Sequence, residues 1–183
     1  MSLVPKRIFF VKGKGFSTNS DLRSFEEALR NACIEKFNIV RVSSIIPPYC
    51  KEVVKEEGLK ELKAGQIIYS VMSKVSSNKK DKVISASIGV AKPLNQEDYG
   101  YLSEKHSIDE DPKTVSKITE NLAIEMFATT HGYDIDSNKN FKENQKISKE
   151  VKKIIETKNI TESVSVKIDG EWATVIAAAI FIV

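Results

Sequence analysis

The chain has 183 residues and a formal net charge of +3, and it is 41% hydrophobic and 29% charged. This balance is typical of one globular domain with a sizeable core, and no repeat or linker divides residues 1–183. No apolar run is long enough to span a membrane, and the N-terminus lacks a signal-peptide cleavage site, so we expect a cytoplasmic protein without a membrane partner. Basic residues do not cluster with aromatic ones, which argues against a nucleic-acid partner.

The first elements are predicted to be a strand and a helix. Residues 7–11 are typical of a buried strand, and the two glycines in residues 12–15 predict a loop after it. Residues 17–21 supply candidate N-caps for a helix. Its apolar face is predicted from side chains at helical spacing, namely Leu22, Phe25, Leu29, Ala32 and Cys33. We therefore expect Cys33 to be a small buried side chain.

A second strand, residues 38–42, leads directly into Ser43 and Ser44. Pro47 and Pro48 lack amide hydrogens and have fixed backbone angles, so the chain must leave the sheet there. Residues 51–63 are charged and predict a solvated excursion. Three more strands are expected at residues 66–72, 82–92 and 99–105.

The C-terminal part is predicted to contain two helices and a hairpin. Asp111-Pro112 is a favourable helix start, and the helix ends at Gly132. Its apolar face is predicted to comprise Val115, Ile118, Leu122, Ala123, Met126 and Thr129. Residues 139–158 predict an outer amphipathic helix, and Asp169-Gly170 predicts a turn between two final strands. The order of elements indicates an α+β fold or a layered α/β sandwich.

The sequence gives little indication of a metal site or of a hydrolase active site. The two histidines, His106 and His131, do not have ligand spacing, and no G-x-S-x-G elbow is present. On residue type alone, Ser43-Ser44 before two prolines is most often a turn. The alternative is a serine that attacks the preceding carbonyl carbon and converts the amide to an ester. Elimination then cuts the chain and leaves a dehydroalanine, which hydrolyses to a pyruvoyl group, a ketone that reacts with amines and serves as an electron sink.

The sequence around Ser43 resembles the self-cleavage site of pyruvoyl-dependent arginine decarboxylases. The matching stretch is Asn38-x-x-Arg-Val-Ser43-Ser44-Ile-x-Pro-Pro. Further similarities to that family are Phe25-Glu-x-Ala-Leu-x-Asn-Ala, the small-residue strand of residues 84–91, Gly100-Tyr-Leu-Ser-Glu104 and the alanines 177–179. Together they cover most of the chain in the same order.

The resemblance implies a role for each matching residue. Ser44 becomes the pyruvoyl group, and cleavage gives a small chain, 1–43, and a large chain, 44–183. Glu104 matches the acid that protonates the carbanion left by carbon dioxide. Asn38 helps to hold the cleavage geometry and, with Ser43 and Ile45, the substrate. Glu26 replaces the family's usual aspartate, which faces the guanidinium of arginine, and it can still accept a bidentate hydrogen bond.

The resemblance also implies the architecture, the assembly and the reaction. We expect an αββα sandwich with a largely antiparallel sheet core, assembled as a homotrimer or a hexamer with active sites between subunits. The expected reaction converts L-arginine to agmatine and carbon dioxide for polyamine synthesis, with the covalent pyruvoyl group and without a metal or pyridoxal phosphate. Two alternatives stay open: decarboxylation of another amino acid, because of Glu26, and an unprocessed, non-catalytic homologue.

Overall fold

The computed structural model describes residues 3–133 and 149–183, and it has the predicted α+β fold. One sheet has five strands in the order β2 (Asn38–Arg41), β5 (Ile67–Ser77), β9 (Trp172–Ile182), β1 (Arg7–Ser17) and β4 (Lys51–Glu52). The other has four, in the order β3 (Ile45–Ile46), β7 (Gly100–Ile108), β6 (Val83–Pro93) and β8 (Ile155–Ser165). The helices are α1 (Asp21–Ala32), α2 (Lys55–Lys60) and α3 (Pro112–Thr130).

Antiparallel pairing dominates both sheets. The longest ladders of the five-stranded sheet join β1 and β5 to β9, and β1 is paired along its whole length, from Arg7 opposite Ile182 to Ser17 opposite Trp172. In the four-stranded sheet, β6 is antiparallel to both β7 and β8. The described parallel pairs are the two short ones, β2 with β5 and β1 with β4.

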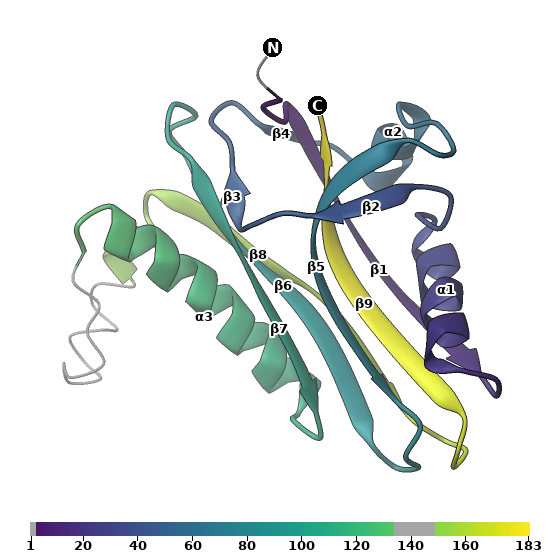
Figure 1. The fold of residues 1–183 in the computed structure, drawn as a ribbon. Helices are drawn as coiled ribbons and strands as arrows, with labels where there is room; N and C mark the ends of the chain where they lie inside the picture. Colours follow the sequence, from purple (N-terminus) through teal and green to yellow (C-terminus); the bar gives the residue numbers. More distant parts are fainter. Residues whose placement is uncertain (1–2, 134–148) are drawn as a thin grey trace.

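Three apolar clusters hold the elements together (Figure 1). The first lies between the two sheets and includes Val71 from β5, Ile88 from β6 and Ala177 from β9. The second packs α1 on the outer face of the five-stranded sheet, and the third packs α3 on the outer face of the four-stranded sheet. None of the helices in the described residues combines the length and apolar character needed to cross a membrane.

The loop predicted at residues 12–15 is wrong, because β1 continues through it to Ser17. The two glycines allow a helix to approach closely rather than the chain to turn. A Cβ atom on Gly13 would lie 2.3 Å from the carbonyl oxygen of Ala28, and one on Gly15 would lie 2.3 Å from that of Ser24. Both carbonyls belong to α1, so the glycines let this helix lie directly on the strand.

Two predictions about the first helix and the charged segment after it need correction. Cys33 is exposed, because the helix ends there with Cys33 in the left-handed conformation at φ 66°. Residues 51–63 are more than a solvated excursion, since they form β4 and α2. Gly58 in α2 is buried against the ring of Phe9.

The predicted apolar face of α3 is partly wrong. Val115 and Ala123 are buried as expected, whereas Ile118 is 42% exposed and Leu122 is 39% exposed. The remaining buried positions are Thr119, Ile124, Phe127 and Ala128. The amphipathic helix predicted over 139–158 lies partly outside the described residues, and its last part is strand, because β8 begins at Ile155.

Candidate functional site

The predicted cleavage pair lies where the chain crosses from one sheet to the other. The strand β2 ends at Arg41 in the five-stranded sheet, and β3 begins at Ile45 in the four-stranded sheet (Figure 1). The crossing segment, residues 42–44, is held at both ends. The amide of Val42 donates to the carbonyl of Ser70 at 3.0 Å, and the amide of Leu102 donates to the carbonyl of Ser44 at 2.7 Å.

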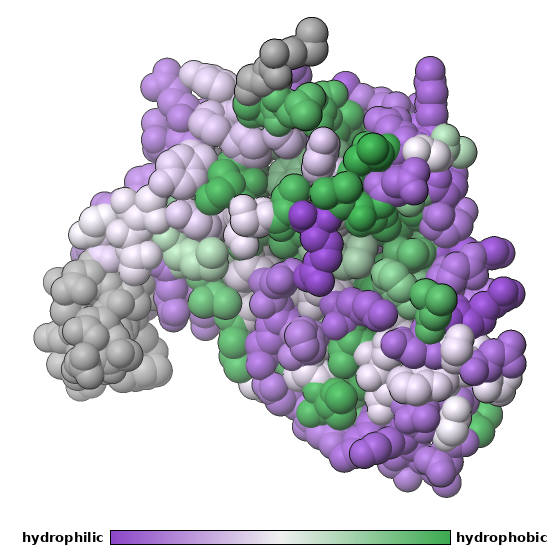
Figure 2. Space-filling model, viewed as in Figure 1, coloured by the Kyte–Doolittle hydropathy of each residue, from purple (hydrophilic) through white to green (hydrophobic). Residues whose placement is uncertain are grey.

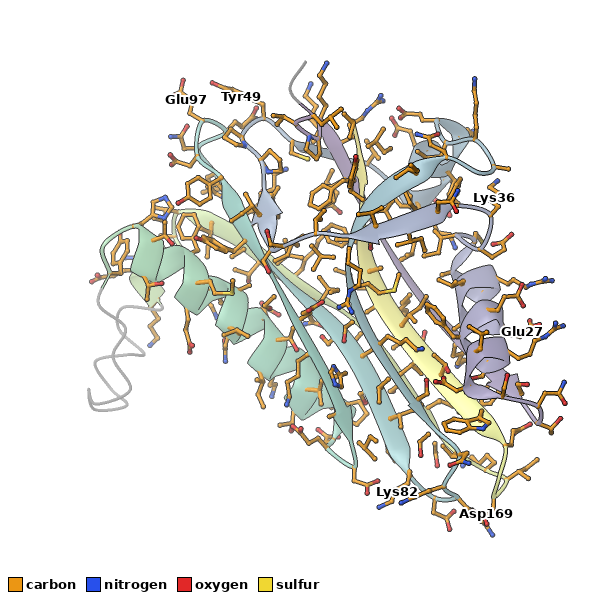
Figure 3. The ribbon with its side chains drawn as sticks, viewed as in Figure 1. Glu27, Lys36, Tyr49, Lys82, Glu97 and Asp169 are labelled. Carbon is orange, nitrogen blue, oxygen red and sulfur yellow. The ribbon has the colours of Figure 1, made fainter. Side chains whose placement is uncertain are left out.

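The proline corner after β3 is anchored to the connection between β6 and β7. The amide of Tyr49, which has a φ of 59°, donates to the carbonyl of Gln96 at 2.9 Å. Its hydroxyl lies 3.4 Å from a carboxylate oxygen of Glu97, and the two side chains are neighbours in Figure 3. The chain that follows Ser44 is therefore fixed to the four-stranded sheet on both sides of the prolines.

An apolar pocket of about 330 Å³ borders the crossing segment. It is lined by residues from both sheets and the N-terminal segment: Leu3, Pro5, Val42, Ser43, Ile45, Pro47, Tyr69 and Phe181. Figure 2 shows apolar surface gathered over the region of β2 and β3. Val42 and Ile45, on either side of the serines, are both exposed large apolar residues. Ser43 is exposed and Ser44 is half-buried, so the bond between them is close to the surface of a single chain.

Glu104 lies on the same side of the molecule as the serines. It is two residues along β7 from Leu102, which points into the core between the sheets, so Glu104 also points toward the five-stranded sheet. There its carboxylate accepts hydrogen bonds from Arg41 Nη2 at 3.1 and 3.3 Å. The same nitrogen donates to the carbonyl of Met72 at 2.5 Å. The sequence motif contains Arg41, but its contact with Glu104 was not predicted.

Asn38 lies at the other end of β2. Its side-chain amide donates to the carbonyl of Gly65 at 2.7 Å. Because side chains alternate along a strand, Asn38 points to the opposite face of β2 from Arg41. Among the contacts of the described residues, none joins Asn38 to the serines or to Glu104.

Glu26 lies on α1, outside the five-stranded sheet. One carboxylate oxygen accepts a hydrogen bond from Arg30 Nε at 2.6 Å, and this bond raises the pKa of the Arg30 guanidinium. The other oxygen, Oε2, is buried without a hydrogen-bond partner among the described residues. Within one chain, Glu26 thus binds a guanidinium of its own helix and does not contact the serines or Glu104. The structure places Ser44 and Ile45 beside β7, the strand that carries Glu104, whereas Glu26 and Asn38 make no contact with that strand among the described residues.

The part of the chain that the structure describes contains no group of three histidine, cysteine, aspartate or glutamate residues that could hold a metal ion. The buried thiol belongs to Cys50, whose pKa is raised to about 11 by burial. A thiol with that pKa stays protonated at neutral pH and is a poor nucleophile or ligand.

Comparisons with known proteins agree on one family. The model of the family described as "Pyruvoyl-dependent arginine decarboxylase" matches residues 7–183. A protein of Chlorobaculum tepidum, named "Probable pyruvoyl-dependent arginine decarboxylase", is 47% identical over 182 residues, which are 100% of this chain and 99% of the relative. "Pyruvoyl-dependent arginine decarboxylase" of Methanococcoides burtonii is 43% identical over 98% of this chain and 99% of its own length. "Pyruvoyl-dependent arginine decarboxylase 2" of Methanosarcina mazei is 40% identical over 98% of each chain.

Proposed function

This chain belongs to the pyruvoyl-dependent arginine decarboxylase family, and we propose that it cuts itself between Ser43 and Ser44 and then decarboxylates L-arginine to agmatine and carbon dioxide, a step toward polyamines. The observation that carries the proposal is the position of the serine pair. Both serines lie in the three-residue segment that joins β2 in one sheet to β3 in the other. Cleavage there breaks no ladder of either sheet, and the hydrogen bonds of Val42 and Ser44 hold both new ends in place.

The cleavage chemistry needs only the chain and one water molecule. Ser44 Oγ attacks the carbonyl carbon of Ser43, the C–N bond breaks, and the Ser43 acyl group passes to Oγ while the Ser44 nitrogen becomes an amine. Loss of the Ser44 Cα proton then breaks the Cβ–O bond and gives a Ser43 carboxylate and a dehydroalanine. Water hydrolyses the dehydroalanine, releases ammonia and leaves a pyruvoyl group at position 44.

The residues around Ser44 fit such a group. The carbonyl oxygen of Ser44 would become the amide oxygen of the pyruvoyl group, and it already accepts the Leu102 amide at 2.7 Å. The pocket bordered by Val42, Ser43 and Ile45 provides space beside it. When formed, the pyruvoyl carbonyl serves as the electron sink for the breaking carbon–carbon bond, in place of pyridoxal phosphate or a metal.

The remaining roles follow the family pattern. Glu104 donates the proton that replaces carbon dioxide, and Ser43 and Ile45 border the substrate. Glu26 binds the substrate guanidinium, and Asn38 supports the cleavage geometry and the substrate. Within one chain, Glu26 and Asn38 lie apart from Glu104. We therefore propose a homotrimer or a hexamer in which Glu26 and Asn38 of one subunit lie near Glu104 of a neighbouring subunit. We also propose that the fold is an αββα sandwich, that its single domain is cut into 1–43 and 44–183, and that the enzyme works in the cytoplasm.

Intact-mass measurement of the purified protein tests the cleavage. We expect two fragments, 1–43 and 44–183, with a pyruvoyl group at the start of the larger one. Ser44→Ala should give one uncut chain of 20.5 kDa without decarboxylase activity. Ser116→Ala, which removes a half-buried hydroxyl on α3, should process normally. Two fragments from Ser44→Ala would rule out Ser44 as the nucleophile.

The same preparation tests the alternatives. An intact, inactive wild-type chain would favour the non-catalytic homologue. The alternative that another amino acid is the substrate is tested by comparing turnover rates. The comparison is needed because the Arg30 guanidinium already binds one carboxylate oxygen of Glu26, the residue proposed to bind the substrate. We expect turnover of arginine to exceed that of lysine and ornithine, because only a guanidinium can bind a carboxylate through two parallel hydrogen bonds. Faster turnover of either amine would change the assigned substrate while leaving the pyruvoyl chemistry intact.

A further inference from the structure

We infer that Arg41 is a positioning residue for self-cleavage: its guanidinium ties the end of β2 to Glu104 on the facing sheet, and this contact holds the crossing segment for attack by Ser44. The inference rests on the proposed cleavage between Ser43 and Ser44. Arg41 is the last residue of β2 and precedes the bond to be cut by two residues.

The ion pair connects the two sheets next to the covalent crossing. Arg41 Nη2 contacts the Met72 carbonyl on β5, in its own sheet, and the Glu104 carboxylate on β7, in the other sheet. Residues 42–44 connect the same two sheets through the backbone. The guanidinium and the crossing segment are therefore two parallel links between the end of β2 and β7.

The partners of Arg41 are themselves fixed relative to each other. Ser73, which follows Met72 on β5, donates its hydroxyl to the carbonyl of Lys105, which follows Glu104 on β7, at 2.7 Å. The Ser73 side chain is nearly inaccessible, at 2% exposure. This bond joins the sheets at the point where Arg41 bridges them, so the backbone positions of its two partners are held relative to each other.

The crossing segment is short, so the position at which β2 ends determines where the bond to be cut lies. Three residues span at most about 10 Å when fully extended. Attack on the Ser43 carbonyl requires Ser44 Oγ to be held close to that carbon in the right direction, and small displacements of reacting atoms cost large factors in rate. The Leu102 amide fixes the Ser44 side of the bond, and the Val42 amide and Arg41 fix the Ser43 side.

The contribution of this pair to folding should be small. The side chains of Arg41 and Glu104 are 63% and 44% exposed, and exposed ion pairs contribute at most about 1 kcal/mol to stability. An effect on cleavage that far exceeds the effect on stability would therefore identify a positioning role.

The test follows the rate at which newly synthesised chain is converted to fragments in a cell-free translation reaction. Arg41→Gln should slow cleavage about tenfold or more, and Arg41→Lys should be intermediate because its single ammonium cannot reproduce the guanidinium contacts. Arg23→Gln is the matched control, since Arg23 forms an exposed ion pair with Glu27 on α1, and it should cleave at the wild-type rate. Melting temperatures are compared in the uncleavable Ser44→Ala background and should stay unchanged.

A charge exchange gives the decisive comparison. Arg41→Glu and Glu104→Arg should each slow cleavage, and the double variant should cleave faster than either single variant while lacking the decarboxylase acid. A wild-type cleavage rate in Arg41→Gln would overturn this inference but not the proposed cleavage. The same holds for a slow rate that comes with a large fall in melting temperature and is not rescued by the charge exchange. A wild-type chain that stays intact would overturn the proposed cleavage as well.

Discussion

Glu104 faces Arg41 in the uncut chain, whereas the proposed reaction needs its carboxyl group as a proton donor. The two demands belong to different stages. Before cleavage, Glu104 accepts hydrogen bonds from the end of the future small chain. After the proposed cleavage, Ser43 would carry a new carboxylate two residues from Arg41. This second anion would compete with Glu104 for the guanidinium and so free Glu104 for its proposed role toward the substrate.

This separation predicts the behaviour of Glu104→Gln. The amide keeps an oxygen that can accept from Arg41, so cleavage should go to completion, although it cannot donate an acidic proton. We expect turnover by fully processed enzyme to fall by about 10²–10⁴-fold, the usual range for loss of a general acid. Glu110→Gln, which removes an exposed partner of Lys105 near the same strand, is the control and should retain activity. Normal turnover by Glu104→Gln would remove Glu104 from the acid role.

The sequence alone predicted the positions of some residues and not of others. Ser43, Ser44 and Glu104 are recognisable from motifs, and in the structure the Ser44 carbonyl accepts the amide of Leu102, two residues before Glu104 on β7. The contact between Arg41 and Glu104 could not be predicted, because it depends on how β2, β5 and β7 are aligned across two sheets. Cys33 was misplaced for a local reason: a left-handed helix end normally favours glycine or asparagine, and a cysteine gives no such signal.

Among the elements, the small-residue strand β6 lies directly under α3, with Gly89 against the Thr119 carbonyl. The periodicity of α3 suggested a partly wrong apolar face, because Thr119 is buried at 0% exposure while Ile118 is exposed. The Thr119 hydroxyl is satisfied by the Val115 carbonyl at 2.6 Å, so burial costs it no hydrogen bond.

The same contact predicts the effect of Gly89→Ala. The added Cβ atom would lie 2.2 Å from the Thr119 carbonyl oxygen, so α3 must shift away from β6. Overpacking of this kind costs about 1–3 kcal/mol. The free energy of unfolding, measured by urea denaturation of the uncleavable Ser44→Ala chain, should fall by that amount. An unchanged unfolding midpoint would show that the helix is not held against the strand at Gly89.

For the molecule as a whole, the topology predicts that the two fragments stay together after cleavage. The proposed small chain contains β1, α1 and β2, and β1 is hydrogen-bonded to β9, in the proposed large chain, along all of its 11 residues. Ile8 and Phe9 of β1 are buried at 1% and 0% exposure, in the core between the sheets and in the core under α1 respectively. Separation would therefore expose both cores.

An affinity tag on the N-terminus of the small chain tests this association. Under native conditions the tag should retain residues 44–183 in equal amount through extended washing, and size-exclusion chromatography should show one species containing both fragments. Concentrated guanidinium chloride should release the large chain from the tagged one, whereas Ser44→Ala should stay a single chain under both conditions. Loss of the large fragment in a native wash would mean that the crossing segment, and not the β1–β9 ladder, holds the molecule together. The proposed cut would then disassemble the fold, which is incompatible with its serving to form the active site.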